Sequence, residues 1–103
     1  RAGLRHPPGP DLQLEYPVAL AEGGRLVAGY VDLLAAGPDG LAVVDFKTDA
    51  PPRGELAATH PAYVEQVRAY ARILEALGLA PAGTVRAGLL FTAEREIRWV
   101  TRR

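Results

Sequence analysis

Three charged residues lie in stretches of sequence that are otherwise apolar: Asp32, Asp45 and Lys47. Side chains alternate along a β-strand, so Asp45 and Lys47, two residues apart, are expected to point to the same side. Lys47 is also the only lysine among the 12 lysine and arginine residues of the chain. Burying such charges is unfavourable unless each is paired or holds a metal. The three residues therefore indicate a functional site.

The chemistry that these residues suit is hydrolysis by a metal-activated water. Asp32 and Asp45 lie on neighbouring strands if those strands pair through the turn at 37–40, although the sequence leaves their offset open. Two ionised carboxylates repel each other unless a cation lies between them, and all-oxygen ligation favours Mg²⁺ or Mn²⁺ over Zn²⁺. Lys47 would position the water or stabilise developing negative charge on a phosphodiester. A structural ion pair between Asp45 and Lys47 is the alternative.

The elements that must position these residues follow from periodicity and turn signals. Strands are expected at 12–20, 25–35, 41–47, 85–92 and 96–101, and one helix at 62–77. The long loop and helix before the fourth strand allow a crossover, so the third and fourth strands are expected to be parallel. The order β-β-β-α-β-β predicts an α/β fold, with a mixed central sheet and a helix packed on it.

Each amphipathic element has an expected buried side. In the first strand it comprises Leu12, Leu14, Tyr16, Val18 and Leu20. In the helix it comprises Tyr63, Val67, Tyr70, Leu74 and Leu77.

Length and composition set further limits. The 103 residues predict one domain at 12–103, preceded by a linker or arm at 1–11. The chain has no methionine, so we expect it to be excised from a longer polypeptide. Its formal net charge is zero, so any nucleic-acid site must be local. No apolar run is long enough to cross a membrane, and no membrane partner is expected.

Cysteine is absent from the chain. This excludes disulfides, a thiolate zinc site and an iron–sulfur cluster held by cysteine. It also fits a reducing compartment, and we expect a cytoplasmic location.

Three short motifs together resemble those of one nuclease family. They are G-x-x-D at 29–32, D-F-K-T-D at 45–49 and Q-x-x-x-Y at 66–70. At this spacing and on these elements they are similar to the RecB/AddA-type nuclease domains of the PD-(D/E)XK superfamily. With the flanking strands, the resemblance spans about 12–100, and it implies a restriction-endonuclease-like fold.

The resemblance also implies an activity and its residues. Asp32 and Asp45 would ligate Mg²⁺, with Mn²⁺ as a substitute, and Lys47 would position the water or stabilise the transition state. Gln66 and Tyr70, one helical turn apart, would support the site or contact DNA. The expected reaction is exonuclease-type hydrolysis of DNA, in a helicase–nuclease of double-strand-break repair. A helicase domain would then supply single-stranded DNA ends.

Several roles stay open. Glu15 is similar to a glutamate often found on the family's first strand, but a solvated strand edge explains it as well. Tyr70 equally suits the core. His60 is expected to mark the helix start without a catalytic role, and Asp49 to cap a loop. Most arginines near the C-terminus are expected on a solvated strand face, with phosphate contact as the alternative: Arg95, Arg98, Arg102 and Arg103.

The sequence departs from the family in two respects. It lacks the cysteines that hold an iron–sulfur cluster in some relatives, so that subclass is excluded. Relatives often carry a further metal ligand on a helix upstream of the first strand, and His6, among prolines, is not expected to replace it. The alternative function is therefore a catalytically inert nuclease-fold module for DNA binding or complex assembly. The motifs alone do not distinguish DNA from RNA.

Overall fold

The computed structural model describes residues 11–102. Its elements are β1 (Asp11–Glu22), β2 (Arg25–Gly37), β3 (Gly40–Lys47), α1 (Leu56–Thr59), α2 (Pro61–Ala76), β4 (Arg86–Phe91) and β5 (Glu96–Val100). The predicted order of strands and long helix is confirmed. The linker predicted at 1–11, including His6, lies outside the described residues except for Asp11, where β1 begins.

The short helix α1 adds to the predicted order, in a segment expected to be a loop. Its four residues are too few to be stable as an isolated helix. Leu56 is buried, so packing against the rest of the fold stabilises α1. Neither described helix is long and apolar enough to cross a membrane.

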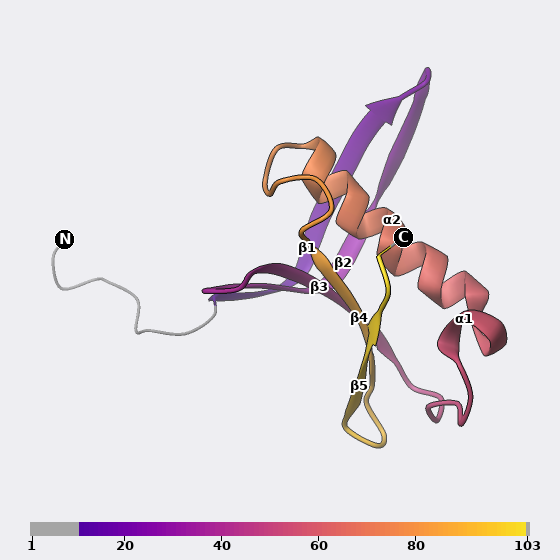
Figure 1. Cartoon of the computed structure of the whole chain (residues 1–103). Coiled ribbons are helices and arrows are strands. Elements are labelled where there is room, and N and C mark those ends of the chain that lie inside the picture. Colours follow the sequence, from indigo (N-terminus) through magenta and orange to yellow (C-terminus); the bar gives the residue numbers. More distant parts are fainter. Residues whose placement is uncertain (1–10, 103) are drawn as a thin grey trace, which may run out of the picture.

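The five strands form one mixed sheet with the order β1-β2-β3-β4-β5. β3 and β4 are parallel and the other neighbouring pairs are antiparallel, so the predicted crossover is confirmed. The chain makes this crossover through α1 and α2, and α2 lies across one face of the sheet (Figure 1). A parallel connection needs such a crossover because its two strands run in the same direction.

The core lies between α2 and the sheet. Each large apolar side chain buried there contributes about 1.5–3 kcal/mol to folding. The predicted helix positions Val67 and Leu74 are fully buried, whereas Leu77 is exposed because it follows the last residue of α2. The largest fully buried side chains are Phe91, Leu74, Leu89, Val31, Val43, Val67 and Val85.

The hairpin of β1 and β2 changes its buried side part-way along. Val18 is buried as predicted, but Leu12 and Leu14 are 62% and 67% exposed, so their predicted burial is wrong. Glu15 between them and Val18 has φ 53°, a left-handed conformation that interrupts the alternation of side chains. On β2 the buried positions step by three residues, from Val31 to Leu34.

The sheet face opposite α2 keeps apolar side chains in contact with solvent. Backbone pairing runs from Leu14 through Leu33, Val44 and Gly88 to Trp99, so these residues form one row across all five strands. Leu14 and Trp99, at the two ends of the row, are exposed. Within the described residues, this face is therefore only partly covered.

Candidate active site

Asp32 and Asp45 meet where the backbone pairing of β2 and β3 ends. The last pair is Leu33 with Val44, so Asp32 and Asp45 occupy the next position on their two strands. The Asp32 side chain replaces the next backbone acceptor, because the Phe46 N–H donates a hydrogen bond to Asp32 Oδ2 at 2.8 Å. β3 continues beside β4, with Asp45 paired to Leu89. The register thus places both carboxylates on the same face of adjacent strands.

Asp45 is the buried member of this pair. It is 7% exposed, and it is the only charged residue in the buried set of the described chain. Burial raises the pKa of the Asp45 carboxyl above its ordinary value, Lys47 opposes this rise, and the nearby Asp32 carboxyl adds to it. The protein therefore holds a carboxylate where an added positive charge would be stabilising.

Lys47 supplies one such charge. Its Nζ lies 2.7 Å from Asp45 Oδ2, and the side chain is only 17% exposed. The expectation that Asp45 and Lys47 share one side of the strand is confirmed. Lys47 Nζ also donates a long hydrogen bond of 3.4 Å to Gln66 Oε1 on α2. Residues from β3 and α2 thus fix the ammonium from two sides.

Tyr70, one helical turn after Gln66, contacts β2. A Cβ atom added to Gly29 would lie 2.8 Å from Tyr70 Oη and 3.3 Å from Tyr70 Cε1, so the missing side chain of glycine makes room for the ring. Tyr70 is half-buried and packs against the core. The structure therefore brings Gln66 to Lys47 and Tyr70 to Gly29.

Glu15 lies across from Asp32 on the neighbouring strand. It falls between the pairs Leu14–Leu33 and Tyr16–Val31. Its side chain is exposed and its backbone has the positive φ described above. Among residues 11–102 no hydrogen bond or ion pair involves the Glu15 side chain, so its part in the site stays a prediction.

A second group of side chains, for which we predicted no role in the site, lies beside Lys47. Lys47 Nζ lies 4.1 Å from the ring centroid of Tyr63. Tyr63 Oη donates a hydrogen bond to Asp49 Oδ2 at 3.1 Å, and this bond raises the pKa of Tyr63 above its ordinary value. His60 Nε2 is 3.6 Å from the same Asp49 oxygen. One signal pointed to Tyr63: it precedes Gln66 by three residues and so shares its helix face.

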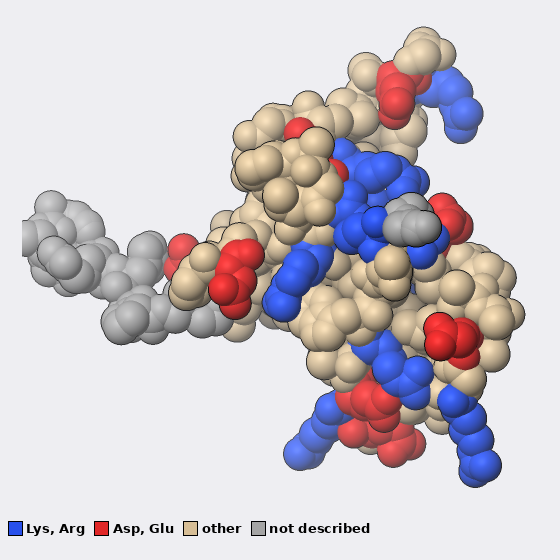
Figure 2. Space-filling view, viewed as in Figure 1, with Lys and Arg blue, Asp and Glu red and all other residues tan. Residues whose placement is uncertain are grey.

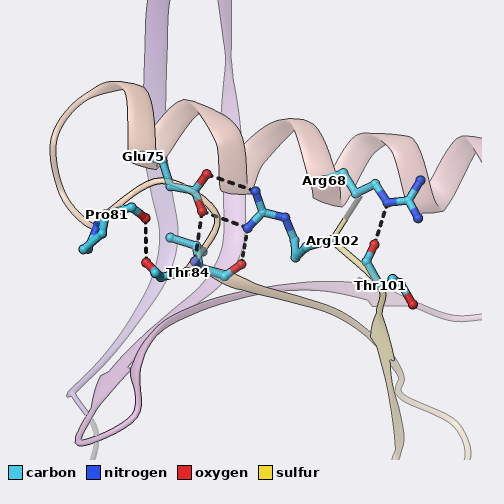
Figure 3. Close-up of polar contacts among 7 residues, drawn as sticks. Arg68, Glu75, Pro81, Thr84, Thr101 and Arg102 are labelled. Carbon is cyan, nitrogen blue, oxygen red and sulfur yellow. Dashed lines mark hydrogen bonds and ion pairs between the residues drawn. The ribbon is translucent and has the colours of Figure 1, made fainter.

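Two of the arginines near the C-terminus, Arg98 and Arg102, bind other groups of the protein, whereas Arg95 is exposed in the turn between β4 and β5. Arg98 Nη2 donates to Pro52 O at 2.6 Å, and Arg102 binds Glu75. Basic side chains gather over α2 beside the C-terminal segment (Figure 2). Beside α2, Arg68 donates a hydrogen bond to Thr101 O and Arg102 donates to Glu75 (Figure 3). Arg103 lies outside the described residues.

The donor set decides which metal these residues suit. Asp32 and Asp45 offer carboxylate oxygens, which hard cations prefer, and Mg²⁺ commonly binds one or two carboxylates while keeping several waters. Within residues 11–102, no cluster of three histidine, cysteine, aspartate or glutamate side chains could hold a metal. The pair therefore fits an ion that completes its coordination with water and substrate.

A family model of the PD-(D/E)XK nuclease superfamily matches residues 5–99. The chain belongs to the PD-(D/E)XK nuclease superfamily. The mixed five-stranded sheet with α2 packed on it is the restriction-endonuclease-like fold expected for a PD-(D/E)XK nuclease. The nuclease-like nature of the domain rests on this membership.

One curated relative carries the same combination of activities that the motifs suggested. The chain is 46% identical over 52 residues to an ATP-dependent helicase/nuclease subunit from Desulforudis audaxviator (strain MP104C). The match covers 50% of this chain and 4% of that protein, so the chain spans only a small part of its relative. The predicted resemblance to RecB/AddA-type nuclease domains is confirmed.

Proposed function

We propose that this PD-(D/E)XK domain is a metal-dependent deoxyribonuclease that hydrolyses DNA phosphodiesters with Mg²⁺, or with Mn²⁺ in its place. The observation that carries the proposal is the buried Asp45 carboxylate, adjacent to Asp32 and 2.7 Å from the Lys47 ammonium. Isolated buried charges are unfavourable, and active sites are where proteins commonly keep them.

Asp32 and Asp45 would hold the divalent cation. When bound, it would lower the pKa of a water and neutralise charge on the phosphate. Asp32 Oδ2 already accepts the Phe46 N–H, which fixes this carboxylate against β3 at the residue after Asp45. Glu15, on the strand beyond Asp32, is a further supporting residue in this proposal.

Lys47 would act on the attacking water or on the charge that develops on the phosphate. Asp45 and Gln66 each accept one of its N–H groups, which leaves a third donor for the reaction. A compact ammonium with donors in several directions suits this role better than a planar guanidinium. Tyr70 would hold α2 against β2 and thereby keep Gln66 in reach, with DNA contact as a further role.

The proposal extends to the longer polypeptide of which this domain would be a part. Residues 12–103 would be the nuclease domain of a longer helicase–nuclease in double-strand-break repair, residues 1–11 its linker, and its action exonucleolytic on single-stranded DNA ends. The name of the relative, which combines helicase and nuclease, supports a helicase partner. A cytoplasmic location is consistent with the proposed hydrolysis of DNA ends.

The decisive experiment compares cleavage of labelled single- and double-stranded DNA in Mg²⁺, Mn²⁺ and EDTA. Asp45→Ala and Lys47→Ala should each lower the cleavage rate at least about a hundredfold, because the first removes a metal ligand and the second removes the positive charge beside the reacting phosphate. Asp39→Ala, in the exposed turn between β2 and β3, is the matched control and should cleave normally.

Three outcomes would count against parts of the proposal. Binding of DNA without cleavage, unchanged by the substitutions, would favour the inert module for binding or assembly. Cleavage of RNA in preference to DNA would change the substrate class. Equal cleavage of circular and linear single strands would exclude an exonuclease, because a circle offers no end.

A further inference from the structure

We propose that Tyr63 is a positioning residue for Lys47, with its ring face holding the ammonium and Asp49 holding the ring. The inference rests on the nuclease function proposed above and extends it to Tyr63 and Asp49, which have no role in that proposal.

Three side chains surround Lys47 Nζ. Asp45 Oδ2 lies 2.7 Å away, Gln66 Oε1 3.4 Å away, and the Tyr63 ring centroid 4.1 Å away. The carboxylate and the amide oxygen each take one N–H group. An aromatic face attracts the positive charge as a whole within about 6 Å of its centroid. Tyr63 therefore restricts the ammonium without needing its third donor.

Two side chains, Asp49 and His60, hold the Tyr63 ring in place. Tyr63 Oη donates to Asp49 Oδ2 at 3.1 Å, and Asp49 follows β3 by two residues. His60 Nε2 lies 3.6 Å from the same oxygen, and the His60 and Tyr63 rings are 5.0 Å apart between centroids. The segment after β3 and the start of α2 thus hold one ring from its hydroxyl edge and from a neighbouring ring.

Tyr63 also packs against the core, and a packing role and a positioning role predict different effects of substitutions at this residue. A packing role alone predicts that losing the ring changes stability, with no specific effect on the Lys47 environment. A positioning role predicts a change at the Lys47 side chain and in kcat. Tyr63→Phe should lie between the wild type and a variant without the ring, because it keeps the aromatic face and loses the hydrogen bond to Asp49.

The chain permits a direct measurement because Lys47 is its only lysine. In protein labelled with ¹³C-lysine, a single Cε–Hε NMR signal reports this side chain, without metal or DNA. The ring current of Tyr63 should displace that signal in the wild type and, less strongly, in Tyr63→Phe, whose ring has lost its hydrogen bond to Asp49. Tyr63→Leu should return the signal toward the position of free lysine. Tyr30→Leu, an exposed tyrosine of β2, is the control and should leave it unchanged.

Kinetics then test the consequence. Tyr63→Leu should lower kcat about tenfold with KM within about twofold of the wild type, as expected for an interaction that matters in the transition state. Tyr63→Phe and Tyr63→Trp should stay within about threefold, because an aromatic face remains. If Tyr63→Leu does not fold, Asp49→Ala, Tyr63→Phe and their double variant serve instead. Their effects on the Lys47 signal should be non-additive, because both act through one hydrogen bond.

The outcomes are distinguishable. An unchanged Lys47 signal in Tyr63→Leu, or additive effects in the substitute set, overturns the inference whatever the nuclease assay gives. A displaced signal with unchanged kcat also overturns it, because positioning would then have no catalytic effect. A wild type that cleaves no nucleic acid, with a Lys47 signal that responds to Tyr63→Leu, overturns the proposed function and supports the contact.

Discussion

Lys47 shows how much a single side chain depends on its surroundings. Its ammonium lies against the carboxylate of Asp45, within reach of Gln66 and over the face of Tyr63. These partners come from a strand and a helix that are well separated in the chain. Removing one partner of a buried ion pair leaves an uncompensated buried charge, which is strongly destabilising. The Asp45 carboxylate and the Lys47 ammonium therefore depend on each other.

A conservative change of this charge should not be tolerated. Lys47→Arg keeps the positive charge but replaces a compact ammonium by a planar fork, whose donors do not match the positions of Asp45 Oδ2 and Gln66 Oε1 around Nζ. We expect kcat to fall about a hundredfold while DNA affinity, measured by fluorescence anisotropy, stays within about threefold. Arg53→Lys, an exposed position before α1, is the control for exchanging these side chains. Full activity of Lys47→Arg would mean that charge alone is sufficient.

At the scale of elements, the geometry of the site depends on the contact between Tyr70 of α2 and Gly29 of β2. Gly29 lets the Tyr70 ring approach the strand, and Gln66 one turn earlier then reaches Lys47. The hairpin of β1 and β2 changes its buried side near Glu15 and Asp32. This change lets one half of the hairpin contact α2 while the carboxylate of Asp32 joins the site.

Gly29→Ala should disturb this contact. The added Cβ would lie 2.8 Å from Tyr70 Oη, so the ring or the strand must shift, and the free energy of unfolding should fall by about 1–3 kcal/mol. Urea unfolding measures the change. Tyr70→Phe removes the closest atom, so in a double-mutant cycle we expect it to recover about 0.5–1 kcal/mol of that loss. Gly54→Ala is the control, since the nearest atom there is 3.9 Å away.

At the scale of the whole molecule, one ion pair joins the end of α2 to both sides of the last hairpin. Glu75 Oε2 accepts the Val85 N–H at 2.9 Å, and Arg102 binds Glu75 through both of its terminal nitrogens (Figure 3). Arg102 also donates to Val85 O. The Arg102 hydrogen bond is the largest cause that lowers the pKa of Glu75, from 4.5 to about 2.

This pair predicts how stability depends on pH. The pKa of Glu75 is lower in the folded than in the unfolded protein, so its contribution is complete above about pH 4.5 and is lost as pH falls toward 2. Glu75→Gln should therefore lower the free energy of unfolding by about 1–3 kcal/mol at pH 7, with a smaller difference from the wild type at pH 3. Glu65→Gln, which breaks the exposed pair with Arg68, should change it by less than about 0.5 kcal/mol. A difference for Glu75→Gln that does not vary with pH would contradict this account.

Local signals in the sequence determined the strands, the long helix and the turns, because periodicity and turn residues act over a few positions. They also determined that Asp45 and Lys47 share one side of β3, since alternation is a local rule. α1 was not predicted because its stability comes from the packing of Leu56. The exposure of Leu12 and Leu14 was not predicted because it follows from one backbone angle at Glu15.

Only the tertiary structure decided what meets at Lys47. Asp32 lies beside Asp45 through the register of β2 and β3, and the Tyr63 ring lies over the ammonium through the docking of α2. Both depend on how segments distant in the chain are placed to within about an ångström. These distances cannot be predicted from residue types and spacing along the chain, because the distances arise from the packing of all the elements together.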